Sequence, residues 1–549
     1  MAAMLFRPLV LIGLIACAGI GHAAEEFIYT VQTGDHPWNI AQRYLRDTSD
    51  ALRLTRLNRI TNDRTVLPGT RLRIPAQWLK LEATRVQLLA LHGNATITRP
   101  DGGDSVARAG DEVAAGSRVR TGEQSSVMLR FDDGSRVLMR QTSELRLLQT
   151  DKRALGGGFL VTLELVRGGL ENMVTPRTSP DNRFEIRSPA AVAAVRGTRF
   201  RVNANDQSTW TEVLEGTVDV ANATGQVQAG AGLGTLAQLG RAPLAPVPLL
   251  AAPDLSALPA RLERLPIDWQ LTPVPGAVAY RTQLAPDAGF TTIVSDEVST
   301  APRARVLDIA DDNYVMRVQA IAADGLEGIP AERPVLVYTR PQAPTLISPE
   351  PDAQTTSARP VFRWTQLDPG WRYRLELRRS EDLSVVPMHA LTTDSSNGVA
   401  LDTDLAPGRY FWRVASIVAA TGRQGPWGDL QAFRYVLPSP GLDPVRVDAG
   451  NVTLRWPALP NAMAYDLQMA QDGGFEKPLL DVRAETAQHQ LTGLAPGSYR
   501  LRLRAVSQDG YAGPWGPVQS FQVPEPVKPE PNHWEKLLLL IPVLVILGL

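Results

Sequence analysis

The chain has 549 residues, and its 56 Lys and Arg against 57 Asp and Glu give a formal net charge of -1. This balance gives no electrostatic case for nucleic-acid binding, and the length predicts several domains. The 43 prolines and 44 glycines, with few long helical patterns, predict a β-rich chain with many turns.

The first 24 residues, 1–24, have the pattern of a signal peptide. A positively charged start is followed by an apolar centre over Leu9–Ala18 and a small-x-small cleavage site at Gly21–Ala23. The alternative is a transmembrane anchor, but the segment is too short and lacks the flanks of one. Leu14–Cys17 also resembles a bacterial lipobox, which would lipidate Cys17, although ordinary cleavage is favoured. We therefore expect export to the periplasm or cell envelope.

The other end of the chain is strongly apolar. Residues 524–533 predict a stiff Pro-rich spacer, and residues 534–549 a hydrophobic tail. Its apolar run, Leu537–Leu549, is shorter than the ~20 residues that a spanning helix needs. Membrane contact is favoured over docking on protein, because the run has no polar face to turn outward.

Residues 27–76 show a strand-helix-helix-strand pattern. Phe27 to Val31 alternate as a short strand. A helical pattern begins at Pro37, whose missing N–H suits a first helical position. A second helical pattern covers about 50–58, and Arg71 to Ile74 return as a strand. The residues expected on or near one face of the first helix are Trp38, Ile40, Ala41, Tyr44 and Leu45.

These elements carry a specific set of motifs. They are the opening Tyr29-x-Val31, the Gly34-Asp35 turn, Leu57-Asn58, and the closing Pro68-Gly69 with Leu72, Ile74 and Pro75. By order and residues the segment resembles a LysM domain, the small module that binds N-acetylglucosamine-containing glycans, chiefly peptidoglycan. The resemblance implies peptidoglycan as a partner.

The resemblance also implies a shallow sugar groove between the strand-to-helix loop and the loop after the second helix. Backbone groups there would bond N-acetyl amides, and Ile60 would contact a methyl group. Many LysM domains have Thr and Leu where this chain has His36 and Pro37. His36 could cap the helix instead or make affinity sensitive to pH. The alternative is a module kept for packing or protein contact. The implied glycan-binding residues are Gly34, Asp35, His36, Pro37, Asn58, Ile60, Thr61 and Asn62.

Residues 86–239 predict an all-β domain of short strands and hairpins, with turns such as Asp132–Ser135. Over about 110–236 the order of motifs, including FEIRSPAAVAAVRGTRFRV and VLEGTVDV, resembles a FecR-type domain. That family is best known as periplasmic regulators that relay the state of an outer-membrane receptor to an anti-sigma partner. Here a signal peptide and a glycan module replace their cytoplasmic segment and membrane helix. The resemblance thus implies a β scaffold with a possible envelope protein partner.

Within this region Arg196 and Arg199 flank Gly197 and could bind an anion. The structural interpretation is favoured, with Gly197 in a tight turn and Phe200 and Val202 in the core.

Residues 241–266 predict a Pro/Ala-rich linker, with one or two helical turns possible at Leu255–Leu265. Three segments then repeat with a period of about 90 residues, at 267–340, 341–437 and 438–523. They resemble fibronectin type III β-sandwiches. The aligned positions are Trp269, Trp364 and Trp456; Tyr280, Tyr373 and Tyr465; and Tyr314-x-x-Arg317, Tyr410-x-x-Arg413 and Tyr499-x-x-Arg502.

The tryptophans of the repeats, including Trp371 and Trp412, could form a carbohydrate platform. A core role is favoured, also for Trp371, because two packed sheets need large side chains to fill their volume.

The sequence offers no catalytic constellation. No two of the 6 histidines lie at metal-ligand spacing, and HExxH is absent. A GxSxG elbow and a phosphate-binding Gly loop are also absent. We expect no enzyme, no cofactor and no metal site.

The sequence therefore predicts a mainly β, multidomain, exported envelope protein that binds peptidoglycan as a non-catalytic scaffold. One alternative is a periplasmic sensor whose FecR-like domain relays a signal, and a second is a cell-wall hydrolase.

Overall fold

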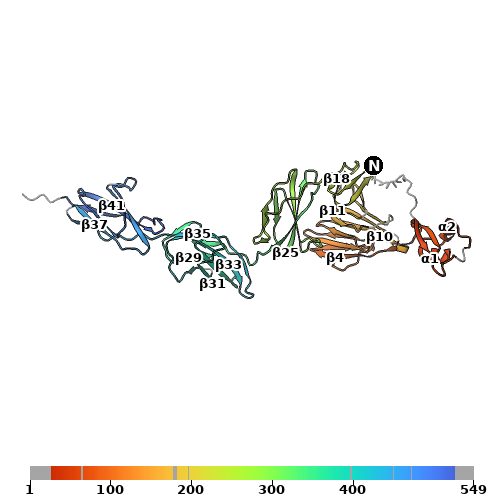
Figure 1. Cartoon of the computed structure of the whole chain (residues 1–549), viewed down its shortest axis with the longest axis horizontal. Coiled ribbons are helices and arrows are strands. Elements are labelled where there is room, and N and C mark those ends of the chain that lie inside the picture. Colours follow the sequence, from red (N-terminus) through yellow and green to blue (C-terminus); the bar gives the residue numbers. More distant parts are fainter. Residues whose placement is uncertain are drawn as a thin grey trace, which may run out of the picture. The chain divides into compact units, whose positions relative to one another are not determined.

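The computed structural model describes residues 26–525, apart from 63–65, 157, 177–181, 196, 396–397, 449 and 472. The predicted signal peptide, Cys17 and the hydrophobic tail lie outside the described residues, as does nearly all of the Pro-rich spacer. The chain divides into two compact units, Met1–Thr339 and Arg340–Leu549 (Figure 1). The described part is mainly β with two α-helices, as predicted. None of its helices is long and apolar enough to span a bilayer.

The N-terminal module has the predicted βααβ order (Figure 1). Its elements are β1 (Glu26–Thr30), α1 (Pro37–Tyr44), α2 (Asp50–Leu57) and β2 (Arg71–Pro75). Strand β1 pairs antiparallel with β2, with Phe27 opposite Ile74. A short 3-10 helix, Ala76–Trp78, follows. The module has its own core, formed by side chains that include Tyr29, Val31, Ile40, Ala41, Leu45, Leu54, Leu72 and Ile74.

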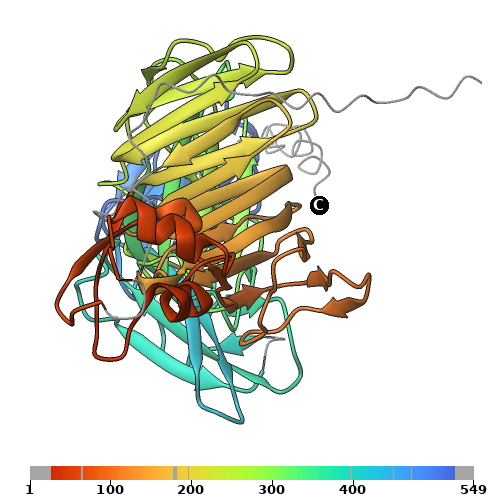
Figure 2. The same cartoon turned by 90° about the vertical axis from the view of Figure 1, so that its right-hand side faces the viewer.

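The next 17 strands form one continuous sheet that folds into two layers around a single core, which we call the roll (Figure 2). Strand β11 belongs to both layers: its first half pairs with β10 and β12, and its second half with β9 and β14. The strands are β3 (Leu81–Ala83), β4 (Val86–His92), β5 (Ala95–Thr98), β6 (Asp104–Val106), β7 (Arg118–Thr121), β8 (Ser126–Phe131), β9 (Arg136–Met139), β10 (Glu144–Arg153), β11 (Phe159–Met173), β12 (Arg183–Arg187), β13 (Val192–Val195), β14 (Arg199–Ala204), β15 (Ser208–Glu215), β16 (Thr217–Asn222), β17 (Gly225–Gly230), β18 (Leu233–Gln238) and β19 (Val247–Pro248).

The expected role of Gly197 is confirmed. Its φ is +74°, and a Cβ there would lie 2.4 Å from the Cα of Pro176. Phe200 and Val202 are buried in the core of the roll. Arg196 lies outside the described residues.

Residues 241–266 do not run free between two domains. Strand β19 pairs with β18, and β20 (Arg261–Leu262) pairs in parallel with β26 (Ala331–Val337). Leu255 and Leu258 are buried in the core of the first repeat. The prediction of helical turns here was wrong. The leucines of this segment pack one by one into the core of the first repeat and do not share one face of a helix.

Each repeat is a two-sheet sandwich with its own core, a five-stranded and a two-stranded sheet in the first case. The remaining strands of the first repeat are β21 (Ile267–Gln270), β22 (Ala277–Ala285), β23 (Ser295–Ser299), β24 (Arg303–Val306) and β25 (Asp312–Ala322). Those of the second are β27 (Leu346–Ser348), β28 (Ala353–Thr355), β29 (Val361–Trp364), β30 (Trp371–Arg378), β31 (His389–Thr393), β32 (Val399–Ala400), β33 (Gly408–Val418), β34 (Gln424–Trp427) and β35 (Gln431–Tyr435). Those of the third are β36 (Arg446–Asp448), β37 (Asn451–Arg455), β38 (Ala462–Gln471), β39 (Leu480–Ala484), β40 (Gln488–Leu491), β41 (Gly497–Ser507) and β42 (Gln519–Val523).

The repeated tyrosines explain why the three copies share a pattern. The hydroxyl of Tyr280 accepts a hydrogen bond from the backbone N–H of Val274 at 2.7 Å, and Tyr373 and Tyr465 do the same six residues back. The second set donates to the carbonyl four residues back, as Tyr499 does to Ala495 at 2.8 Å. Each tyrosine thus fixes a strand-entry loop while its ring fills the core.

The tryptophans follow the core interpretation only in part. Trp364, Trp412 and Trp456 are buried, whereas Trp371 is half-buried at the start of β30.

Candidate glycan-binding site

Asp35 is a structural centre of the N-terminal module. Its carboxylate accepts hydrogen bonds from the Tyr29 hydroxyl at 2.5 Å, the Gln32 N–H at 2.8 Å and the Arg43 guanidinium at 2.6 Å. Burial by itself would raise the pKa of Asp35, but these three donors outweigh it and hold the pKa below its usual value. Because its oxygens are occupied and only 5% of the residue is exposed, Asp35 shapes the turn and is a poor sugar contact.

His36 caps helix α1, which is one of the two roles expected for it from the sequence. The Asn39 N–H donates to His36 Nδ1 at 3.3 Å, and the His36 N–H donates to Asn39 Oδ1 at 2.8 Å. This reciprocal capping box takes the place of a Ser or Thr hydroxyl. Asn39 also donates to the Gly34 carbonyl at 2.9 Å.

Asn58 connects the end of α2 to strand β2. Its amide donates to the carbonyls of Leu54 and Arg73, at 3.0 and 2.8 Å, and its oxygen accepts from the Arg73 N–H at 2.6 Å. Ile60 is half-buried against the core of the module. Thr61 is exposed, as is Asn62. Of the four candidate residues at and after the end of α2, Asn58 and Ile60 therefore position the loop, and Thr61 and Asn62 face solvent.

Strand β2 sets the distance between the two candidate loops. The loop after β1 is tied to Thr70, whose carbonyl accepts from the Val31 N–H at 2.9 Å. The loop after α2 is tied to Arg73 through Asn58. Thr70 and Arg73 are three residues apart, which is about 10 Å along a strand. The loops therefore start close enough to contact neighbouring units of one glycan.

Trp38 was expected among the apolar residues on or near one face of α1, and this was wrong. It is 44% exposed, whereas Pro37, Ile40 and Ala41 are buried. An exposed indole at the first turn of the helix, directly after the capped loop, can stack on a sugar ring.

One face of the roll is closed by the first repeat, and this limits where a partner could bind. Arg140 from the roll pairs with Glu327 at 2.8 Å, and Arg317 from the repeat pairs with Glu171 at 2.8 Å. Arg201 donates to the carbonyl of Glu327 at 2.6 Å. An apolar contact lies beside these ion pairs, formed by Met128 and Leu138 with Ala285, Phe290 and Ile293.

The same contact holds two buried carboxylates with opposite pKa shifts. Burial raises the pKa of Glu212 to about 7, with Arg201 opposing and Glu327 reinforcing the shift. Burial also disfavours ionisation of Glu327, but Arg140 and Arg281 outweigh it and lower its pKa. Divergent carboxylates can mark an acid-base site. Here the two side chains are 0% and 5% exposed, so neither carboxylate is open to a substrate. The pair is structural.

The structure contains no group of three or more His, Cys, Asp or Glu placed to hold a metal ion within the residues it describes.

Two family models match the chain. A LysM domain matches residues 29–75 and a FecR protein matches residues 117–219. The chain therefore contains a LysM domain followed by a FecR domain, and fibronectin type III-like repeats come after them. Domains of these types are binding and regulatory modules, and the first two are typical of envelope proteins. LysM domains generally bind N-acetylglucosamine glycans such as peptidoglycan.

Two solved structures are similar to segments of the chain. A candidate anti-sigma factor from Parabacteroides distasonis is 15% identical, with a TM-score of 0.20; the match covers 24% of this chain and 59% of that one. A segment of two fibronectin type III domains from chicken tenascin is 16% identical, with a TM-score of 0.25; the match covers 33% of this chain and 99% of that one. Values this low say nothing about function.

Proposed function

We propose that the protein is an exported, non-catalytic scaffold of the cell envelope that binds peptidoglycan through its LysM domain. The observation that carries the proposal is the LysM match, with a capped Gly34 turn, exposed Thr61 and Asn62, and an exposed Trp38 on the same small module. The roll and the sandwiches would then present further surfaces at a fixed place on the wall.

Binding of the chain to insoluble peptidoglycan tests this. The chain without residues 1–24 is compared with a deletion of 27–75 and with Trp38→Ala. Leu52→Ala, at a similarly exposed apolar position on α2, serves as the matched control. We expect the deletion to abolish binding. Loss of one stacking contact of about 1–1.4 kcal/mol predicts roughly 5- to 10-fold weaker binding for Trp38→Ala. Equal binding by the deletion and the intact chain would refute the proposal.

The FecR domain supports a second candidate, in which the roll relays a signal to an envelope partner. A gene encoding a sigma factor, receptor or sensor next to this one would favour it. The hydrolase alternative predicts clearing in a peptidoglycan zymogram, and we expect none, because the buried carboxylates of the roll have no access to substrate.

A further inference from the structure

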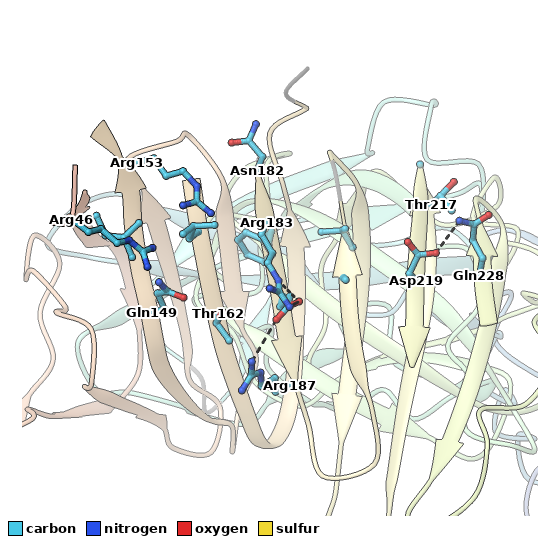
Figure 3. A pocket seen from close by; sticks show the side chains of 17 residues that line it. Arg46, Gln149, Arg153, Thr162, Asn182, Arg183, Arg187, Thr217, Asp219 and Gln228 are labelled. Atoms are coloured by element: carbon cyan, nitrogen blue, oxygen red, sulfur yellow. Dashed lines mark hydrogen bonds and ion pairs between the residues drawn. The ribbon is translucent and has the colours of Figure 1, made fainter. Parts of the chain in front are cut away.

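The outer face of the roll that the first repeat leaves open carries a polar groove of about 1000 Å³ (Figure 3). It runs over β10, β11, β12, β13, β16 and β17, which pair in that order. Five strand spacings of about 4.8 Å make it about 24 Å long. On β12, Ile186 is buried in the core of the roll, whereas Arg183, Glu185 and Arg187 line the groove.

The groove has more cations than anions. Four arginines line it, Arg46, Arg153, Arg183 and Arg187, against Glu185 and Asp219. Arg183 and Arg187 share Glu185, the second at 3.7 Å. Asp219 accepts a hydrogen bond from the Gln228 amide at 2.8 Å. The groove therefore contains two more guanidinium groups than carboxylates.

The other two arginines are held by backbone carbonyls. Arg46 Nε donates to the Leu79 carbonyl at 3.2 Å, and Arg153 Nη1 donates to the Ala76 carbonyl at 2.9 Å. The Nε of Arg153 is buried and has no partner. The other N–H groups of these two guanidiniums can donate to a carboxylate, the anion that arginine binds best. Arg46 and Arg153 form one such position, and Arg183 with Arg187 forms another, two strands or about 10 Å away.

The size and spacing fit a short extended peptide with several carboxylates. An extended chain advances about 3.3–3.6 Å per residue, so the groove accommodates about seven residues. Carboxylates roughly three residues apart would meet both arginine positions. Asp219, toward the far end in Figure 3, could receive an amino group.

The groove begins at the LysM domain, which indicates one source for such a peptide. Arg46 lies just after α1, so it is one helix length, about 12 Å, from the capped Gly34 turn where the glycan would bind. Stem peptides of peptidoglycan contain four or five residues, are attached to the glycan, and carry free carboxylates. A stem of about 13–18 Å spans that distance.

We propose that this groove binds the carboxylate-rich stem peptide of peptidoglycan, with Arg46 and Arg153 at one carboxylate and Arg183 and Arg187 at the next. The proposal rests on the proposed function, because it takes the LysM domain to hold the glycan. Glycan and stem would then be recognised together, which would select cell-wall polymer over glycans that lack peptide.

Calorimetric titration of the chain without residues 1–24 tests this. The probes are an N-acetylated stem tetrapeptide, the same peptide with its carboxylates amidated, hexaglutamate, and chitotetraose. We expect the tetrapeptide to bind, and amidation to weaken it at least 10-fold. Arg46→Gln, which leaves Glu185 paired, should weaken tetrapeptide binding about 5-fold or more. The double variant Arg183→Gln with Arg187→Gln should weaken it further. Arg130→Gln on β8, an exposed arginine outside the groove, should have no effect.

The two proposals fail separately in this design. Chitotetraose binding without tetrapeptide binding would overturn the groove and leave the glycan site standing. Tetrapeptide binding without chitotetraose binding would do the reverse. Unchanged affinity in Arg46→Gln, or tighter binding of hexaglutamate than of the stem peptide, would also overturn the stem-peptide site; the latter would indicate an acidic protein segment instead.

Discussion

Removal of the Glu327 side chain should uncouple the roll from the first repeat. Its carboxylate pairs with Arg140 at 2.8 Å and Arg281 at 3.0 Å, and accepts from the Gln319 amide at 2.9 Å. Glu327→Ala leaves Arg140 buried without a carboxylate, while Arg281 keeps Asp296 at 2.6 Å. Breaking a buried pair by removing one partner costs about 3–5 kcal/mol, because the remaining charge stays buried.

Scanning calorimetry and native-state hydrogen exchange measure this effect. A multidomain chain melts in several transitions, and we assign the roll and first repeat to one of them. At about 2–4 °C per kcal/mol for a unit of this size, the Glu327→Ala transition should fall by about 6–20 °C. Exchange should increase in β14 and β25 together. Glu327→Gln keeps the shape of the side chain and loses its charge. Its transition temperature should lie between those of the unchanged chain and Glu327→Ala.

The matched control is Glu215→Gln. Glu215 is 72% exposed and lies 3.7 Å from Arg199, so its loss should cost about 0–1 kcal/mol. If Glu327→Ala shifts the transition no more than Glu215→Gln does, the buried network does not hold the two parts together.

Two further predictions concern carboxylates with shifted pKa values. Glu212, with its pKa raised from 4.5 to about 7, binds its proton more tightly in the folded chain. Stability should therefore fall as pH rises from about 4.5 to about 7, and Glu212→Gln should remove that slope in Tm against pH; an unchanged slope would contradict it. Asp35, with its pKa lowered from 3.8, stabilises the module above that pH and loses this effect as pH falls. Asp35→Asn should destabilise the LysM domain by about 1.5–3 kcal/mol at neutral pH, seen as faster exchange in β1 and α1. Undisturbed exchange would show that Asp35 is not the centre of the turn.

Local pattern was sufficient for much of the fold. The order of the LysM elements and the capping role of His36 depend on neighbours within a few residues. The repeated tyrosines are similar, since each hydroxyl reaches a backbone group only four to six residues away. The spacing of the tyrosines in the sequence therefore predicts the geometry of these loops directly.

The candidate sugar site was predictable as a place and less so residue by residue. All eight of its residues were expected to contact the glycan, but the polar side-chain atoms of Asp35 and Asn58 form hydrogen bonds within the module. Residue type identifies a group that can bind a sugar, but only its partners in space show whether that group is already occupied. Trp38 shows the converse, because exposure and not helical spacing makes it a candidate.

The sequence by itself determined the kinds of domain and their order, because strand alternation, turn glycines and motif spacing are properties of contiguous residues. Only the tertiary structure decided which surfaces remain open. The first repeat covers one face of the roll through side chains more than 100 residues apart, such as Arg140 and Glu327. Residues 241–266 pair with the roll through β19 and with the first repeat through β20. The arginine-lined groove on the other face exists because strand pairing places β10, β12 and β16 in one layer, with β11 between the first two and β13 between the last two.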